Sequence, residues 1–159
     1  MLPIWKPVHL RFSLPKPEDY PYEVTNLAEA IKKKRMDLKL SKVELAQILN
    51  VTPQSIGFYE HERKKPLLYI LKRILDWLEY VPPLGVDETT LGGQLFIYRI
   101  QNGYRQKDIS NALKMDRWAI TKIENDEEVK PMYIEKVRRL LEVENKTKRG
   151  MMRLSILGT

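Results

Sequence analysis

The chain carries one sequence pattern twice, at a separation of 64 residues. Segment 41–49 aligns with segment 105–113 without a gap, and upstream in the same register Arg35 falls on Arg99. Few identities survive, but apolar character and helix-capping residues recur at the aligned positions. A repeat of this length indicates one small domain present twice, because solenoid units are shorter.

The composition excludes several classes of protein. The 159 residues include no cysteine and only two histidines, His9 and His61, which argues against disulfides and zinc and agrees with a reducing cytosol. We find no apolar run of about 18 residues and no secretory signal pattern. No glycine-rich phosphate loop or catalytic constellation is recognisable. We therefore expect a cytoplasmic protein that is not an enzyme and needs no metal, cofactor or small-molecule ligand.

The net charge of +7 is unevenly distributed. Residues 25–80 hold eleven Lys and Arg against seven Asp and Glu, whereas residues 88–144 hold ten of each. Residues 145–159 add four basic residues and no acid. Basic surfaces favour polyanions such as DNA or RNA, although an ordinary solvated basic protein has the same composition.

Composition and helical periodicity divide the chain into five segments. Five of the ten prolines lie in the first 24 residues, which predicts an extended arm. No alternating strand pattern is present except at 152–157. We therefore predict an all-α fold with two tandem domains of four to five short helices each. The predicted boundaries are 1–24 for the arm, 25–80 for the first domain, 81–88 for the linker, 89–144 for the second domain and 145–159 for a basic tail.

Local signals in the first domain predict two short helices joined by a tight turn. Ser41 and Glu44 form a capping-box signature, and Asn50 tolerates a left-handed backbone. Thr52 followed by Pro53 is typical of an N-cap and the first residue of a helix. This is the outline of a helix-turn-helix, in which the second helix enters the major groove.

The segment Leu40–Glu60 closely resembles the lambda-repressor-like, Cro-type (XRE-like) helix-turn-helix domain, and the basic loop Arg63–Pro66 is similar to that of the family. The resemblance covers residues 25–80 and, more weakly, 89–143. It implies a bacterial or phage transcriptional regulator, a repressor, associated with the nucleoid. Such a protein would bind double-stranded DNA through helix Pro53–Glu60, as a monomer or a homodimer. The alternative is an antitoxin-like or other interaction module with little specific DNA binding.

The resemblance implies which residues of the first domain face DNA. Lys42 would hold a phosphate and Gln54 would pair with adenine. Phe58 would lie against a thymine methyl group or instead contact a protein partner. The full set is Lys42, Thr52, Pro53, Gln54, Ser55, Phe58, Arg63, Lys64 and Lys65.

The corresponding residues of the second domain are Gln106, Arg117, Trp118 and Lys122, of which Arg117 suits guanine. This copy departs from the family pattern, because its loop 125–128 is acidic where the first copy is basic. Acids near phosphates oppose binding. The second domain is therefore expected either to bind DNA weakly or to serve in dimerisation.

One charge pair of the family recurs in both copies. An Arg of the first helix commonly pairs with a Glu at the end of the recognition helix. Here these are Arg35 with Glu60, and Arg99 with Glu124. We expect two structural salt bridges, with no role in reading bases.

Overall fold

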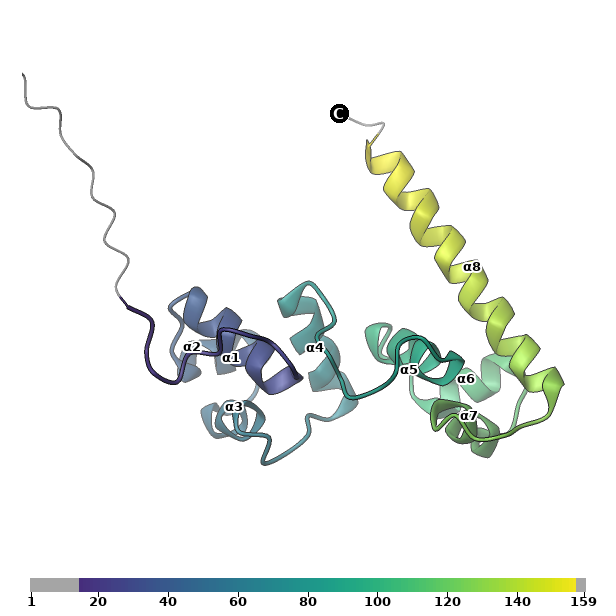
Figure 1. Cartoon of the computed structure of the whole chain (residues 1–159), viewed down its shortest axis with the longest axis horizontal. Helices are drawn as coiled ribbons and strands as arrows, with labels where there is room; N and C mark the ends of the chain where they lie inside the picture. The colour runs from purple at the N-terminus through teal and green to yellow at the C-terminus, as the bar shows by residue number, and fades with distance from the viewer. Residues whose placement is uncertain (1–14, 157–159) are drawn as a thin grey trace, which may run out of the picture.

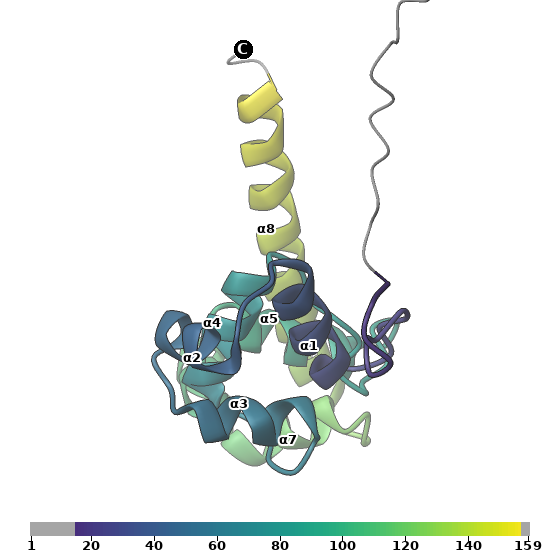
Figure 2. The same cartoon turned by 90° about the vertical axis from the view of Figure 1, so that its left-hand side faces the viewer.

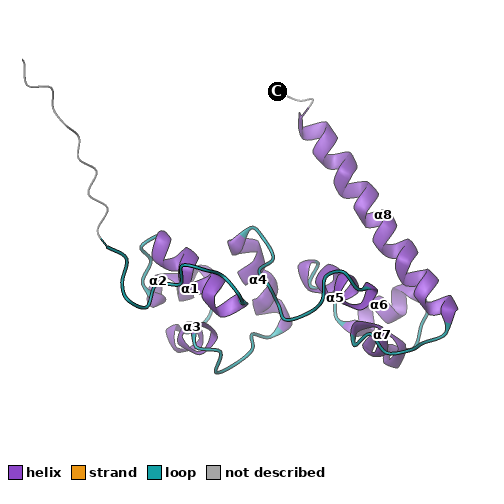
Figure 3. Ribbon diagram, in the orientation of Figure 1, coloured by secondary structure: helices purple, strands orange, loops and turns teal. Residues whose placement is uncertain are grey.

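The computed structural model describes the backbone of residues 15–156 and the side chains of residues 15–143. All regular secondary structure in this part of the chain is α-helical, and it contains no strand (Figure 3). This confirms the all-α prediction. The helices are α1 (Leu27–Asp37), α2 (Lys42–Leu49), α3 (Pro53–Glu60), α4 (Leu68–Leu78), α5 (Leu91–Gln101), α6 (Gln106–Leu113), α7 (Arg117–Glu124) and α8 (Pro131–Ile156).

The helices form two four-helix units, the first unit being α1–α4 and the second unit α5–α8. The first three helices of each unit begin and end at positions 64 residues apart. The turn after the second helix repeats as well, since Asn50 has a φ of 51° and Lys114 a φ of 49°. The sequence repeat is thus a repeat of backbone geometry.

Each unit has a separate hydrophobic core. Helices of eight residues are too short to be stable alone, so the buried apolar face holds them in place. In both units the core takes side chains from all four helices. The fully buried members include Ile31, Leu45, Leu49, Ile56 and Ile74 in the first unit and Leu95, Ile120 and Val137 in the second.

The units lie side by side along the long axis of the molecule, in the order α1, α4, α5, α8 (Figure 1). Between them α4 packs against α5. Helices α3 and α7 lie along the same edge, both in the side view and when the molecule is seen end-on (Figure 2). Within the linker, the side chain of Pro82 is fully buried.

The described part of the N-terminal arm contains no helix and lies against α1. Tyr20 is 7% exposed, and its hydroxyl donates to Asp37 Oδ1 at 2.7 Å. Lys16 Nζ donates to the same carboxylate oxygen at 2.6 Å. These two contacts hold the pKa of Asp37 below its usual range, with Lys16 the larger cause. Residues 1–14 lie outside the described part.

The end of the chain differs from the prediction. Helix α8 continues to Ile156, so 145–156 is a helical extension of the second unit and the strand suggested at 152–157 is wrong for the described residues. The sequence contains no proline after Pro131 that would interrupt α8. A short apolar run such as 152–157 fits a helix as well as a strand. The side chains of the predicted basic tail lie outside the described residues.

Candidate nucleic-acid interface

Both ends of α2 have the local geometry that the sequence predicts. The Ser41 N–H donates to Glu44 Oε2 at 2.7 Å, and the Glu44 N–H donates to Ser41 Oγ at 3.2 Å, which completes the capping box. The bond from Ser41 lowers the pKa of the Glu44 carboxyl. At the other end of α2, the left-handed Asn50 turns the chain toward α3.

The N-terminal turn of α3 lies on the surface. Thr52 is the N-cap, and its hydroxyl oxygen accepts from the Ser55 N–H at 3.2 Å. Pro53 occupies the first turn, where the absence of its N–H has no cost. Thr52, Pro53 and Gln54 are exposed, whereas Ile56 faces the core. This turn therefore presents side chains to solvent from a backbone that is held by the Thr52 cap and by the buried Ile56.

A buried ion pair fixes α3 relative to α1. Arg35 Nε donates to Glu60 Oε1 at 2.6 Å and Nη2 donates to Oε2 at 3.1 Å. The third donor, Nη1, reaches the carbonyl of Leu40 at 3.0 Å. The Glu60 side chain is only 1% exposed. Because every group is paired, the bridge orients α3 and leaves no isolated buried charge.

Lys42 lies next to the Arg35–Glu60 ion pair. Its Nζ is 3.7 Å from Glu60 Oε2, and 42% of its side chain remains exposed. Lys42 is the first residue of α2, where backbone N–H groups also favour an anion. The position suits contact with a phosphate.

The loop after α3 adds three exposed cations, Arg63, Lys64 and Lys65. Lys64 Nζ lies 4.9 Å from the centroid of the Phe58 ring, a cation–π distance. Within the described part of the chain, neither Arg63 nor Lys65 has an ion pair. Their charges are therefore available to a polyanion.

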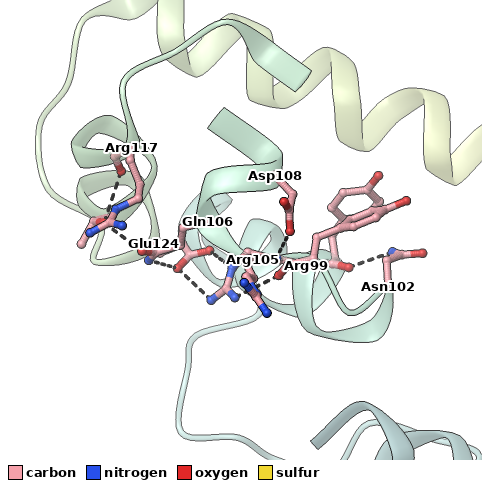
Figure 4. A network of polar contacts seen from close by, with 10 residues as sticks. Arg99, Asn102, Arg105, Gln106, Asp108, Arg117 and Glu124 are labelled. Atoms are coloured by element: carbon pink, nitrogen blue, oxygen red, sulfur yellow. Dashed lines mark hydrogen bonds and ion pairs between the residues drawn. The ribbon is translucent and has the colours of Figure 1, made fainter. Parts of the chain in front are cut away.

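The second unit repeats the ion pair. Arg99 Nε donates to Glu124 Oε1 at 2.6 Å, Nη2 donates to Oε2 at 3.1 Å, and Nη1 donates to the Tyr104 carbonyl at 3.2 Å (Figure 4). At the start of α6, the Arg105 N–H donates to Asp108 Oδ2 at 2.7 Å. The backbone cap is thus kept although Arg105 replaces the usual Ser or Thr.

Gln106 does not lie free on the surface. Its Nε2 donates to Glu124 Oε2 at 2.8 Å, and its Oε1 accepts from the Thr121 hydroxyl at 3.2 Å. Both ends of the amide are used within the unit (Figure 4). In the aligned position of the first unit, Lys42 contacts Glu60 in a similar way. Gln106 therefore serves as an internal brace between α6 and α7.

The surface of α7 differs from that of α3. Arg117 is exposed, and Trp118 is 50% exposed with its ring edge-to-face against Tyr133 of α8, at 6.2 Å between centroids. Lys122 Nζ lies 3.6 Å from Glu127 Oε2 in the acidic loop. One predicted DNA-contacting cation is therefore partly neutralised by its own unit.

Two cations that the sequence did not single out also support the motif. Arg73 Nη1 donates to the Leu49 carbonyl at 3.3 Å. In the second unit, Lys136 Nζ donates to the carbonyls of Leu113 and Lys114 at 2.9 and 3.1 Å. Each satisfies the C-terminal carbonyls of the second helix of its unit. Their partners lie more than twenty residues away, so no local signal identifies them.

Residues 31–83 match the family model described as Helix-turn-helix, which covers a third of the chain. The match runs from α1 through α4 into the linker. No significant match was found among curated proteins or among solved structures. Among the described residues, no helix is long and apolar enough to cross a membrane.

Proposed function

We propose that this chain, whose residues 31–83 are a Cro/C1-type helix-turn-helix domain, is a sequence-specific transcriptional repressor that binds double-stranded DNA. Helix α3 is its main recognition helix and lies in the major groove. The protein acts in the cytoplasm, in association with the nucleoid, and is not an enzyme. The observation that carries the proposal is the exposed first turn of α3 beside a loop of three exposed cations.

The first turn of α3 supplies the base contacts. The Gln54 amide is exposed and offers a donor and an acceptor together, which matches N7 and N6 of adenine. Phe58, one turn later, offers an apolar surface for a thymine methyl group. The Ser55 hydroxyl is 2.9 Å from that of Thr52, so the two act as one polar group.

The cations around α3 supply the contacts to phosphate. Lys42 lies at the start of α2, and Arg63, Lys64 and Lys65 follow the end of α3. Contacts of this kind set the register of a protein on the duplex without reading its sequence. They also release counterions, so binding should weaken steeply as salt rises.

We assign residues 89–143 to a divergent second domain of the same fold. The shared helix bounds, the separate core and the second Arg–Glu pair support this assignment. Its candidate DNA contacts are Gln106, Arg117, Trp118 and Lys122, of which Gln106 also bonds to α7. Whether the chain forms a homodimer is to be measured on the same preparation of the protein.

The test is fluorescence anisotropy of the full chain with a labelled duplex selected from a random pool, over a salt series. We expect specific binding that Gln54→Ala weakens about tenfold, because a good bidentate contact contributes roughly 1–3 kcal/mol. The matched control is Gln94→Ala, the same change at an exposed position on α5. If the chain binds no duplex at low salt, the interaction-module alternative is favoured.

A further inference from the structure

We infer that one chain reads two different half-sites arranged as a direct repeat, in place of the inverted repeat read by a symmetric dimer. This inference rests on the proposed function, because it needs the helix-turn-helix to bind DNA.

The two units are joined head to tail. Helix α4 is the last helix of the first unit, and it packs against α5, the first helix of the second. At this junction a side chain added at Gly103 would place its Cβ 2.9 Å from Lys72 Cδ. Leu75 and Tyr80 share a surface cavity there with Asn102. The contact therefore joins non-equivalent surfaces.

A two-fold axis cannot relate units that touch in this way. Under such an axis the contact of α4 with α5 would require the reciprocal contact of α8 with α1. In Figure 1, α1 lies on the side of α4 away from α5, and α8 begins on the side of α5 away from α4. The order α1, α4, α5, α8 is that of two units that follow one another in the same direction.

The two candidate recognition helices nevertheless lie on the same side of the molecule. Helices α3 and α7 lie along one edge of the molecule in both views (Figures 1 and 2). Inverted half-sites mirror the two-fold symmetry of a dimer, with centres roughly one helical turn apart. Units that follow one another along the duplex without that symmetry meet half-sites in the same orientation.

The two half-sites also differ in sequence. The position of Gln54 is taken by Trp118 in the second unit, and that of Pro53 by Arg117. An exposed guanidinium favours guanine, whereas the amide of Gln54 favours adenine. One unit therefore cannot substitute for the other on its half-site.

The second half-site is the weaker of the two. The loop after α7 carries Glu127 and Glu128, both exposed, at the positions that Arg63 and Lys64 occupy in the first unit. Binding of the first unit holds the second close to the duplex, which gives it a high effective concentration. The buried Pro82 and the contact between α4 and α5 restrict the spacing that the tether permits.

The test is selection of bound duplexes from a random pool by the full chain, followed by measurement of the protein-to-DNA ratio. We expect two distinct motifs on the same strand, centred about 10 to 11 base pairs apart, with one chain per duplex. Insertion of Gly-Ser-Gly between Pro83 and Leu84 should broaden that spacing. Arg117→Ala should weaken binding about tenfold only on duplexes that keep the second motif, whereas Gln94→Ala should have no effect.

An inverted repeat of one motif with two chains bound would overturn this inference and leave the proposed function standing. A single motif with no second contact, unaffected by Arg117→Ala, would do the same. The proposed function itself fails if no sequence is enriched while circular dichroism shows an intact helical fold. The two failures are thus distinguished in one experiment.

Discussion

Arg35 and Glu60, on different helices and 25 residues apart, form a two-pronged ion pair in which Nε lies 2.6 Å from Oε1. Arg99 and Glu124 form the same pair at the same distance in the second unit. In each unit the pair joins the first helix to the end of the third. The ion pair therefore sets the angle at which the candidate recognition helix is presented.

Loss of one member of the buried pair should be severe. We expect Arg35→Ala to lower the free energy of unfolding of the first unit by roughly 3–5 kcal/mol, because the Glu60 carboxylate is left buried and unpaired. The measurement is urea unfolding followed by circular dichroism. Arg139→Ala is the control, since its pair with Glu135 is exposed and should contribute at most about 1 kcal/mol. Equal effects of the two changes would contradict a buried role for the Arg35 bridge.

Two helical glycines should respond in opposite ways to the same substitution. A Cβ at Gly92 would overlap the Ile123 carbonyl, since α5 and α7 approach closely there, whereas nothing lies within 4 Å of a Cβ at Gly57. We expect Gly92→Ala to destabilise the second unit by roughly 1–3 kcal/mol. Gly57→Ala should stabilise the first unit by up to about 1 kcal/mol through helix propensity. Thermal unfolding of both variants checks the prediction, which a gain of stability in Gly92→Ala would refute.

The docking of the N-terminal segment should depend on pH. Lys16 and the Tyr20 hydroxyl lower the pKa of Asp37 in the folded protein. A carboxyl with a lowered pKa stabilises the fold above its ordinary pKa, and this contribution is lost as pH falls through the folded value. The stability gap between the wild type and Asp37→Asn should therefore shrink on acidification from pH 7. A gap that is constant down to pH 2.5 would show that the carboxylate does not hold the segment.

The basic loop should act on affinity without changing sequence preference. We expect Arg63→Gln to weaken binding to specific and random duplexes alike and to reduce the salt slope by about one. Arg139→Gln removes the same charge from α8 and should leave the slope unchanged. Anisotropy titrations at several salt concentrations give both quantities. If Arg63→Gln altered the selected sequence, the residue would instead be a base reader.

Partial neutralisation of Lys122 is a testable feature of the second unit. Its ammonium lies 3.6 Å from Glu127, on a surface open to solvent. We expect Glu127→Gln to strengthen duplex binding and to increase the salt slope, because one opposing charge is removed. Glu135→Gln on α8 is the matched control. Unchanged binding would place this loop away from the DNA.

The local sequence determined the helices of both units. Capping residues, the left-handed position at Asn50 and apolar spacing depend on neighbours within one or two turns, so they can be read along the chain. The Arg–Glu pairs were also predictable, but only through the family resemblance and the 64-residue register. The end of α8 was not, because its last turns carry no clear stop signal.

Only the tertiary structure decided which polar groups are free to bind. The alignment of Gln106 with Lys42 predicts a DNA contact, and folding adds bonds between its amide and Glu124 and Thr121. Arg73 and Lys136 acquire their roles from carbonyls that folding brings near. The head-to-tail order of the units depends likewise on the contact of α4 with α5. A side chain's availability depends on partners distant in sequence, and the sequence alone does not specify their distances.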